Sequence, residues 1–186
     1  MKLVVGLGNP GKKYNQTRHN AGFDVISMLS DRCGESPPSK KAFGSFVGTA
    51  SVIGQKCIFA LPQTYMNRSG QPVASLMGYY KVAPQDVIVV HDELALDFGV
   101  VRCKKAGGHG GHNGLRDIIK HIGNGFLRVR IGIGAPKGEQ SNYVLSQWSA
   151  DQKNTIHDIF EKGCNAVEMI ISDGIMAAMN TFNVRN

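Results

Sequence analysis

Hydrophobic and polar positions divide the chain into short strand-like and longer helix-like segments. Apolar or alternating runs bounded by turn residues predict strands at residues 2–7, 45–51, 56–61, 86–91, 100–104 and 128–133. Apolar residues spaced by three and four predict helices at residues 19–32, 69–81, 113–122, 150–173 and 175–181. Residues 34–41 and 134–142 combine Gly, Pro and Ser with charged residues, so these two stretches are expected to be mobile.

The alternation of strands and helices predicts an α/β fold. We expect a single three-layer domain over residues 1–186, with a twisted mixed β-sheet flanked by helices. Residues 45–61 form a hairpin in this interpretation, with Gly54 in its turn, so part of the sheet is antiparallel. The pattern shows neither an internal repeat nor a domain linker.

The segment Gly6-Leu7-Gly8-Asn9-Pro10-Gly11 follows the first predicted strand and satisfies the G-x-G-x-x-G pattern of dinucleotide-binding loops. Such a loop requires a helix at its third glycine and an acidic residue at the end of a second strand about 20 residues later. Residues 12–20 are instead polar without helical spacing, and Pro10 disfavours helical backbone at Asn9. A nucleotide-dependent oxidoreductase is therefore disfavoured, and measured binding of a nicotinamide cofactor would revive it.

Composition mainly excludes classes of protein. A length of 186 residues and a hydrophobic content of 42% suit one globular domain. No apolar run approaches the roughly 18 residues of a membrane span, and the first strand meets glycine and proline too soon for a signal peptide, so a cytoplasmic protein is expected. The cysteines lie far apart without zinc or redox spacing, and we expect them to be reduced: Cys33, Cys57, Cys103 and Cys164.

Positive charge is concentrated in one segment. Residues 99–137 contain eight Lys or Arg residues against one acid, Asp117, and this local charge of +7 equals the formal net charge of the whole chain. Such a concentration forms either a solvated basic face or a surface that binds nucleic-acid phosphates. Because Phe126 is the only aromatic residue in the segment, contacts to RNA backbone and shape are favoured over base stacking.

Polar side chains follow several predicted strands, and loops at strand ends commonly carry the functional groups of α/β proteins. In chain order they are Asn9 and His19, residues 62–67, His91-Asp92-Glu93, and residues 104–114. A G-x-S-x-G serine elbow is absent from the sequence, while a Cys-His pair formed by folding is left open. His109 and His112 lie in a glycine-rich loop without a nearby acidic ligand, so no metal site is predicted.

Five motifs together resemble the bacterial peptidyl-tRNA hydrolase family. They are GLGNPG at 6–11, TRHNAG at 17–22, PQTYMNRSG at 62–70, HDEL at 91–94 and GGHNGL at 110–115. The resemblance runs in the family's order from Met1 to about Trp148, and beyond it only helical character and length agree. It implies a monomeric α/β enzyme that hydrolyses the ester between a peptide and the terminal adenosine of tRNA, without metal or cofactor.

The resemblance implies that His19 is the catalytic base and Asp92 its partner. A neutral histidine can activate water for attack on an ester. A carboxylate on the other ring nitrogen fixes the tautomer and stabilises the imidazolium that forms. The alternative for His19 alone is a structural residue or helix cap. The alternative for the whole chain is a catalytically silent RNA-binding protein of the same fold, which loss of His19 or Asp92 would have indicated.

Further roles follow from the same resemblance. The expected substrate-binding residues are Asn9, Tyr14, Met66, Asn67, His112 and Asn113, and the expected tRNA phosphate contacts are Lys104, Lys105 and Arg130. Amide side chains can both donate to and accept from a peptide backbone, or hold an oxyanion, and which asparagine does so is left open. The alternatives are a turn role for Asn9, helix caps for Asn67 and Asn113, core packing for Met66, and phosphate binding shared by Arg128.

Two segments need separate expectations. Where the family commonly has Asp-Glu-Leu-Asp-Leu-Pro-Gly, this chain has Asp-Glu-Leu-Ala-Leu-Asp-Phe-Gly at 92–99, which puts the rigidity of that loop in question. Residues 134–148 resemble a lid over the cleft, and residues 150–186 are expected to form C-terminal helices.

Overall fold

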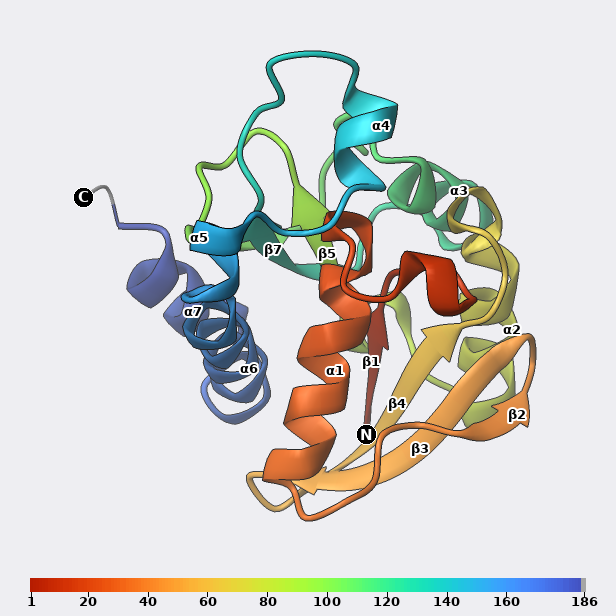
Figure 1. Ribbon diagram of the computed structural model, residues 1–186. Helices are drawn as coiled ribbons and strands as arrows, with labels where there is room; N and C mark the ends of the chain where they lie inside the picture. Colours follow the sequence, from red (N-terminus) through yellow and green to blue (C-terminus); the bar gives the residue numbers. More distant parts are fainter. Residues whose placement is uncertain (185–186) are drawn as a thin grey trace.

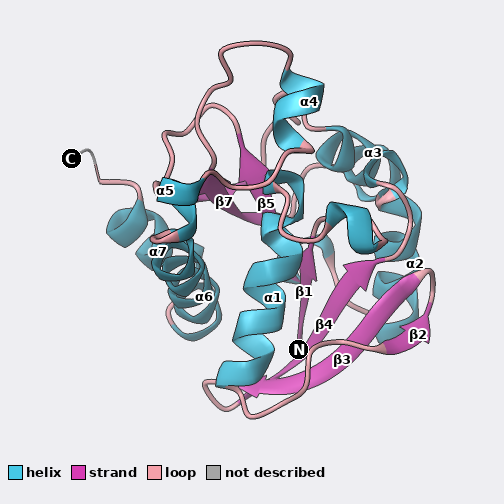
Figure 2. Ribbon diagram, viewed as in Figure 1, coloured by secondary structure: helices cyan, strands magenta, loops and turns pink. Residues whose placement is uncertain are grey.

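The computed structural model describes residues 1–184, and in these residues a mixed β-sheet lies between two layers of helices (Figures 1 and 2). Its strands are β1 (Lys2–Gly6), β2 (Lys40–Ala42), β3 (Ser45–Val52), β4 (Gln55–Pro62), β5 (Val87–Glu93), β6 (Val101–Lys105) and β7 (Leu127–Gly132). Its helices are α1 (Ala21–Arg32), α2 (Gly70–Tyr80), α3 (Asn113–Ile122), α4 (Gln140–Val144), α5 (Ala150–Lys153), α6 (Ile156–Ser172) and α7 (Ile175–Phe182). The predicted α/β class with a mixed sheet is confirmed.

The sheet has a parallel centre and antiparallel edges. Its strand order is β2-β3-β4-β1-β5-β7-β6, with β4, β1, β5 and β7 parallel to one another. Because helices cover both faces, the central strands are continuous apolar runs, such as the fully buried Val87–Val90 of β5. The parallel strands end at one edge of the sheet, where the loops after β1, β4 and β5 meet.

Each face of the sheet has its own hydrophobic core. Helices α1 and α6 pack on one face, and α2 and α3 pack on the other (Figure 1). Helix α7 lies against β6 and α6. None of the helices within residues 1–184 combines the length and the apolar character that a bilayer crossing requires.

The predicted hairpin is confirmed and its turn has a clear cause. Val52 pairs with Gln55, so only Ile53 and Gly54 connect β3 to β4. Both residues have positive φ, 47° and 75°, as a two-residue type I′ turn requires. Glycine adopts this conformation without strain, which explains the position of Gly54.

Apart from shifts of one or two residues at the ends of other elements, three features differ from the sequence-based prediction. Strand β2 was not predicted, because its Lys-Lys-Ala sequence has no apolar alternation and it pairs only with β3 at the sheet edge. Helix α4 lies partly within the stretch expected to be mobile. The predicted helix 150–173 is broken after Lys153, where Asn154 and Thr155 form a turn before α6. The final residues of the predicted C-terminal region, 185–186, lie outside the described residues.

The N-terminal glycines serve close packing of α1 on the sheet. A Cβ on Gly6 would lie 2.3 Å from the carbonyl oxygen of Gly22, and one on Gly22 would lie 2.3 Å from the carbonyl oxygen of Val90. Helix α1 begins only at Ala21, ten residues after Gly11. The glycines of the G-x-G-x-x-G segment therefore serve packing, and the segment is not followed by the helix that a dinucleotide-binding loop requires.

The outer edge of β6 is covered by a side chain from the C-terminal region. Oδ1 of Asn183 accepts a hydrogen bond from the backbone N–H of Cys103 at 2.9 Å, and Nδ2 of Asn183 donates to the Cys103 carbonyl at 2.8 Å. One amide side chain thus satisfies both backbone groups that a neighbouring strand would otherwise pair.

Candidate active site

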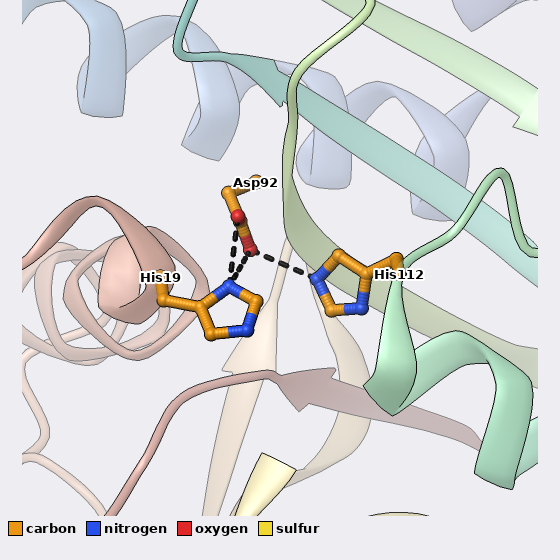
Figure 3. A group of neighbouring side chains, drawn as sticks. All are labelled: His19, Asp92 and His112. Atoms are coloured by element: carbon orange, nitrogen blue, oxygen red, sulfur yellow. Dashed lines mark hydrogen bonds and ion pairs between the residues drawn. The ribbon is translucent and has the colours of Figure 1, made fainter. Parts of the chain in front are cut away.

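Two histidines, His19 and His112, converge on the carboxylate of Asp92 (Figure 3). Nδ1 of His19 lies 2.8 and 3.0 Å from the two carboxylate oxygens, and Nε2 of His112 lies 2.9 Å from Oδ1. The Asp92 side chain is almost fully buried. Sequence analysis expected the contact with His19, but assigned His112 to the substrate instead of to the carboxylate.

Three different elements deliver these side chains. His19 lies in the 3₁₀ turn Arg18–Asn20 directly before α1, and Asp92 lies near the end of β5. His112 precedes α3, at the end of a loop that leaves β6. Because β6 is antiparallel to β7, this loop starts at the opposite end of the sheet and runs back to Asp92. The expectation that functional groups follow strand ends therefore holds for β1, β4 and β5 but not for β6.

Hydrogen bonds define the tautomers of both histidines. Nδ1 of His112 accepts from the backbone N–H groups of Gly114 and Leu115, so its proton is on Nε2 and points at Asp92. His112, and not Asn113, is therefore the N-cap of α3. Nδ1 of His19 likewise donates to Asp92, which leaves its Nε2 unprotonated and available as a base.

Electrostatics reinforce this arrangement. Burial by itself lowers the pKa of His19, but the Asp92 carboxylate outweighs burial, so the pKa of His19 is raised above 6.5. Burial disfavours the charged form of Asp92, but His19 and His112 more than compensate and hold its pKa far below 3.8. Asp92 is therefore an anion at every pH at which His19 is neutral.

A third histidine contacts the backbone of Asp92 from within the core. Nδ1 of His91 donates to the backbone carbonyl of Asp92 at 2.7 Å, and its ring lies edge-on to His112 with centroids 5.1 Å apart. Burial, together with the neighbouring His112, lowers the pKa of His91 to about 3, so this ring is neutral. Sequence analysis noted His91 only as part of a motif, and its tertiary contacts are what identify it.

Asn9 is held in one orientation by its neighbours. Asn20 bonds both backbone groups of Asn9, accepting from its N–H at 2.8 Å and donating to its carbonyl at 3.0 Å. Oδ1 of Asn9 accepts from the backbone N–H of Met66 at 2.8 Å. Within residues 1–184 the Nδ2 donor of Asn9 has no hydrogen-bond partner. Asn20 is a supporting residue that the sequence motifs contained but did not single out.

Met66 connects this amide to the histidine pair. It is 5% exposed and packs in the α2/α3 core, as the core alternative expected, and its substrate role stays a prediction. A Cβ on Gly114 would lie 2.6 Å from Sδ of Met66 and 3.1 Å from Cε1 of His112. The glycine therefore lets the start of α3 pass between the two side chains.

Other predicted substrate residues are less constrained. Asn67 is exposed, Asn113 is exposed and accepts from Arg116, and Tyr14 is half-buried with the Lys13 ammonium over its ring. Asn113 lines the same pocket as His19 and Asp92, whereas Asn67 and Tyr14 are not among the residues that line it. Their expected roles stay predictions.

A pocket of about 220 Å³ opens beside His19 and Asp92. Its other walls come from the loops after β5 and before α3 and from α4, including Leu94, Gly110, Gly111, Gln140 and Val144. The loop at 95–99 that departs from the family pattern is tied down, since Leu96 accepts from the N–H of Gly134 and Asp97 accepts from that of Val100. The pocket thus offers apolar side chains, amides and backbone groups next to the imidazole of His19.

Two of the three predicted phosphate-binding residues, Lys104 and Arg130, share one face of the sheet, whereas Lys105 is the next residue of β6 and points to the other face. Lys104 pairs with Arg128 across β6 and β7, and Arg102 pairs with Arg130, so Lys104 and Arg130 are diagonal neighbours. Arg130 also contacts Glu93 at 3.1 Å, while Lys105 is exposed. Arg128 is buried and donates to the carbonyls of Gly107 and Gly108, so it orders the glycine loop and its suggested share in phosphate binding is wrong.

The histidine and aspartate atoms also have a spacing that a metal ion could bridge. Nδ1 of His19, a carboxylate oxygen of Asp92 and Nε2 of His112 lie within 4.8 Å of one another. In the structure, however, both imidazole N–H groups bond to the carboxylate, so a metal would have to displace two protons and two hydrogen bonds. The two N–H groups and the carboxylate thus satisfy one another's hydrogen-bonding capacity. The metal-free site expected from the sequence stays a prediction.

Comparisons with known proteins agree on one family. The family model described as Peptidyl-tRNA hydrolase matches residues 3–186. Relatives named peptidyl-tRNA hydrolase include one from Syntrophotalea carbinolica, 47% identical over 100% of this chain and 98% of its own, and one from Mycolicibacterium vanbaalenii, 46% identical over 96% and 95%. The crystal structure of peptidyl-tRNA hydrolase from Acinetobacter baumannii superposes with a TM-score of 0.92 at 40% identity, covering 100% of this chain and 96% of that one.

Proposed function

The chain belongs to the peptidyl-tRNA hydrolase family, enzymes that hydrolyse the ester of peptidyl-tRNA, and on that premise we propose that His19 is the general base of this reaction and Asp92 its partner. The observation that carries the proposal is the free Nε2 of His19, which lies beside the pocket while Nδ1 is fixed by Asp92. A base needs this arrangement, with one nitrogen oriented and the other open to water.

The chemical steps follow from these atoms. Nε2 of His19 takes a proton from a water molecule as its oxygen attacks the ester carbonyl carbon. The resulting imidazolium is stabilised by Asp92, and it then returns the proton to the ribose oxygen as the carbon–oxygen bond of the ester breaks. The free Nδ2 of Asn9 is a preoriented donor for a carbonyl oxygen of the substrate, with Asn67 and Asn113 as further amides of the peptide site.

The tRNA part of the substrate binds the surface that carries the basic residues of β6 and β7. Lys104, Lys105 and Arg130 would bind phosphates of the acceptor stem, and their distance from His19 would then select a substrate of matching length. The sequence further predicts a monomer that acts in the cytoplasm, with residues 134–148 as a lid.

Release of labelled N-acetyl-aminoacyl groups from tRNA, measured with chelator present, tests the proposal. Wild type is expected to hydrolyse the ester and His19→Ala to lose turnover while retaining tRNA binding, and His157→Ala, which alters an exposed histidine on α6, serves as the control. Near-normal hydrolysis by His19→Ala would remove the base assignment. Tight tRNA binding without hydrolysis by the wild type would favour the catalytically silent alternative.

A further inference from the structure

Arg18 is a buried cation with every hydrogen-bonding contact of its guanidinium on one segment. It is 6% exposed. Nη1 donates to Oγ of Ser146 and to the carbonyl of Gln147 at 2.5 and 2.6 Å, and Nη2 donates to Oε1 of Gln152 at 2.7 Å. These acceptors belong to residues 146–152, which run from the end of α4 into α5.

Aromatic rings complete the surroundings of this cation. The guanidinium carbon lies 4.3 Å from the ring centre of Tyr143 and 5.5 Å from that of Trp148. The acceptors are neutral, so the charge of Arg18 is compensated by oriented dipoles and ring faces. Burying a cation in this way is costly unless each contact is kept, so the position of residues 143–152 depends on Arg18.

The same segment forms a wall of the catalytic pocket. Gln140, Ser141 and Val144 line the same pocket as His19, and Tyr143 precedes Val144 in α4. The backbone joins the two sides as well, since the N–H of Arg18 donates to the carbonyl of Ser146 at 3.1 Å. Arg18 thus directly precedes His19 in the chain, and its side chain anchors the segment that follows the α4 wall of the same pocket.

We propose that Arg18 is a positioning residue that sets the width of the substrate pocket by anchoring residues 140–148 against the turn that carries His19. The proposal rests on ester hydrolysis at this pocket. Arg18 does not touch the His19–Asp92 contact, so its loss widens the pocket and weakens substrate capture while the base keeps its partner. The proposal predicts an effect on KM and not on the pH dependence of the base.

The test compares Arg18→Met with Arg32→Met, which removes the same charge from the far end of α1. Arg32 ties α1 to α6 through Glu161, Asn165 and Glu168, away from the pocket. Arg18→Met is expected to raise KM about tenfold with kcat within about threefold and the acid limb of kcat/KM unmoved. Arg32→Met should leave all three unchanged.

Trp148 supplies a second readout, because it is the only tryptophan of the chain and is 5% exposed beneath Arg18. Its emission should shift to longer wavelength in Arg18→Met and not in Arg32→Met. Arg18→Lys, which keeps the charge, should show intermediate KM and emission, and it decides the question if Arg18→Met does not fold. Unchanged KM and emission in Arg18→Met would overturn the proposal, and so would a loss confined to kcat with a displaced acid limb. Absence of hydrolysis by the wild type would instead contradict the function proposed above.

Discussion

Replacing Asp92 by Asn removes one charge at the centre of the site with little change in shape. The carboxylate accepts hydrogen bonds from two imidazole N–H groups, those of His19 and His112. An asparagine has one oxygen for these two donors, and its amide N–H₂ faces the other. Asp92→Asn therefore leaves His19 less firmly oriented and its imidazolium without an anion.

The magnitude follows from the contact distance. With Nδ1 of His19 at 2.8 Å from the carboxylate, the two charge centres are about 4 Å apart, and at an effective dielectric constant of about 20 their attraction is about 4 kcal/mol. This attraction exists only once His19 is protonated in the transition state. Since 1.36 kcal/mol corresponds to a factor of ten in rate, kcat should fall about 10³-fold.

The assay is single-turnover release of labelled N-acetyl-aminoacyl groups from tRNA across the pH range. Wild-type activity should fall as pH drops through a pKa above 6.5, because the neutral form of His19 is required. In Asp92→Asn the cause of that raised pKa is gone, so the acid limb should move to lower pH. Asp97→Asn changes an exposed acid in the following loop and should behave as wild type. A kcat for Asp92→Asn within tenfold of wild type would refute the reasoning.

Three further predictions concern binding and stability. Lys104→Ala combined with Arg130→Ala should weaken tRNA binding and reduce its log–log salt slope by about 2, measured by titration at several salt concentrations; an unchanged slope would place the phosphates elsewhere. Burial raises the pKa of Asp24 from 3.8 to about 7, so the fold loses stability as pH rises through that window. Asp24→Asn should therefore be more stable than wild type by about 1–2 kcal/mol at pH 8 and equal to it below about pH 4 in urea unfolding, and equal stability at pH 8 would contradict this. Gly22→Ala should cost about 3 kcal/mol or more, because its Cβ would meet backbone atoms at 2.3 and 2.4 Å, whereas Gly78→Ala, with open space in α2, should gain up to about 1 kcal/mol; similar thermal unfolding of the two variants would exclude the packing argument.

Local sequence patterns predicted those elements whose formation depends on neighbours along the chain. The bounds of α3, Asn113–Ile122, were predicted as observed because its apolar spacing coincides with a glycine at either end. The β3–β4 hairpin followed from its turn sequence. Strand β2 and the break before α6 were missed, since a three-residue edge strand and a two-residue turn leave almost no periodic signal.

The candidate site was predictable in its members but not in its connections. The motifs contained His19, Asp92 and His112, yet their spacing along the chain could not show that one carboxylate serves both rings. The sequence could not predict that Arg128 is buried and donates to the glycine loop, because its sequence neighbours are those of an exposed basic strand. Counting charge in residues 99–137 therefore overestimated the number of cations on the exposed surface, because Arg128 is buried.

The amide bridge from Asn183 to Cys103 has a consequence for self-association. Strand β6 lies at the outer edge of the sheet, and Asn183 occupies the hydrogen-bonding groups at its middle residue. Without that side chain, the N–H and carbonyl of Cys103 would be open to a strand from another molecule, and two sheets could join edge to edge. Helix α7 and Asn183 thus block strand pairing at this edge, which disfavours aggregation and is separate from any contact with tRNA.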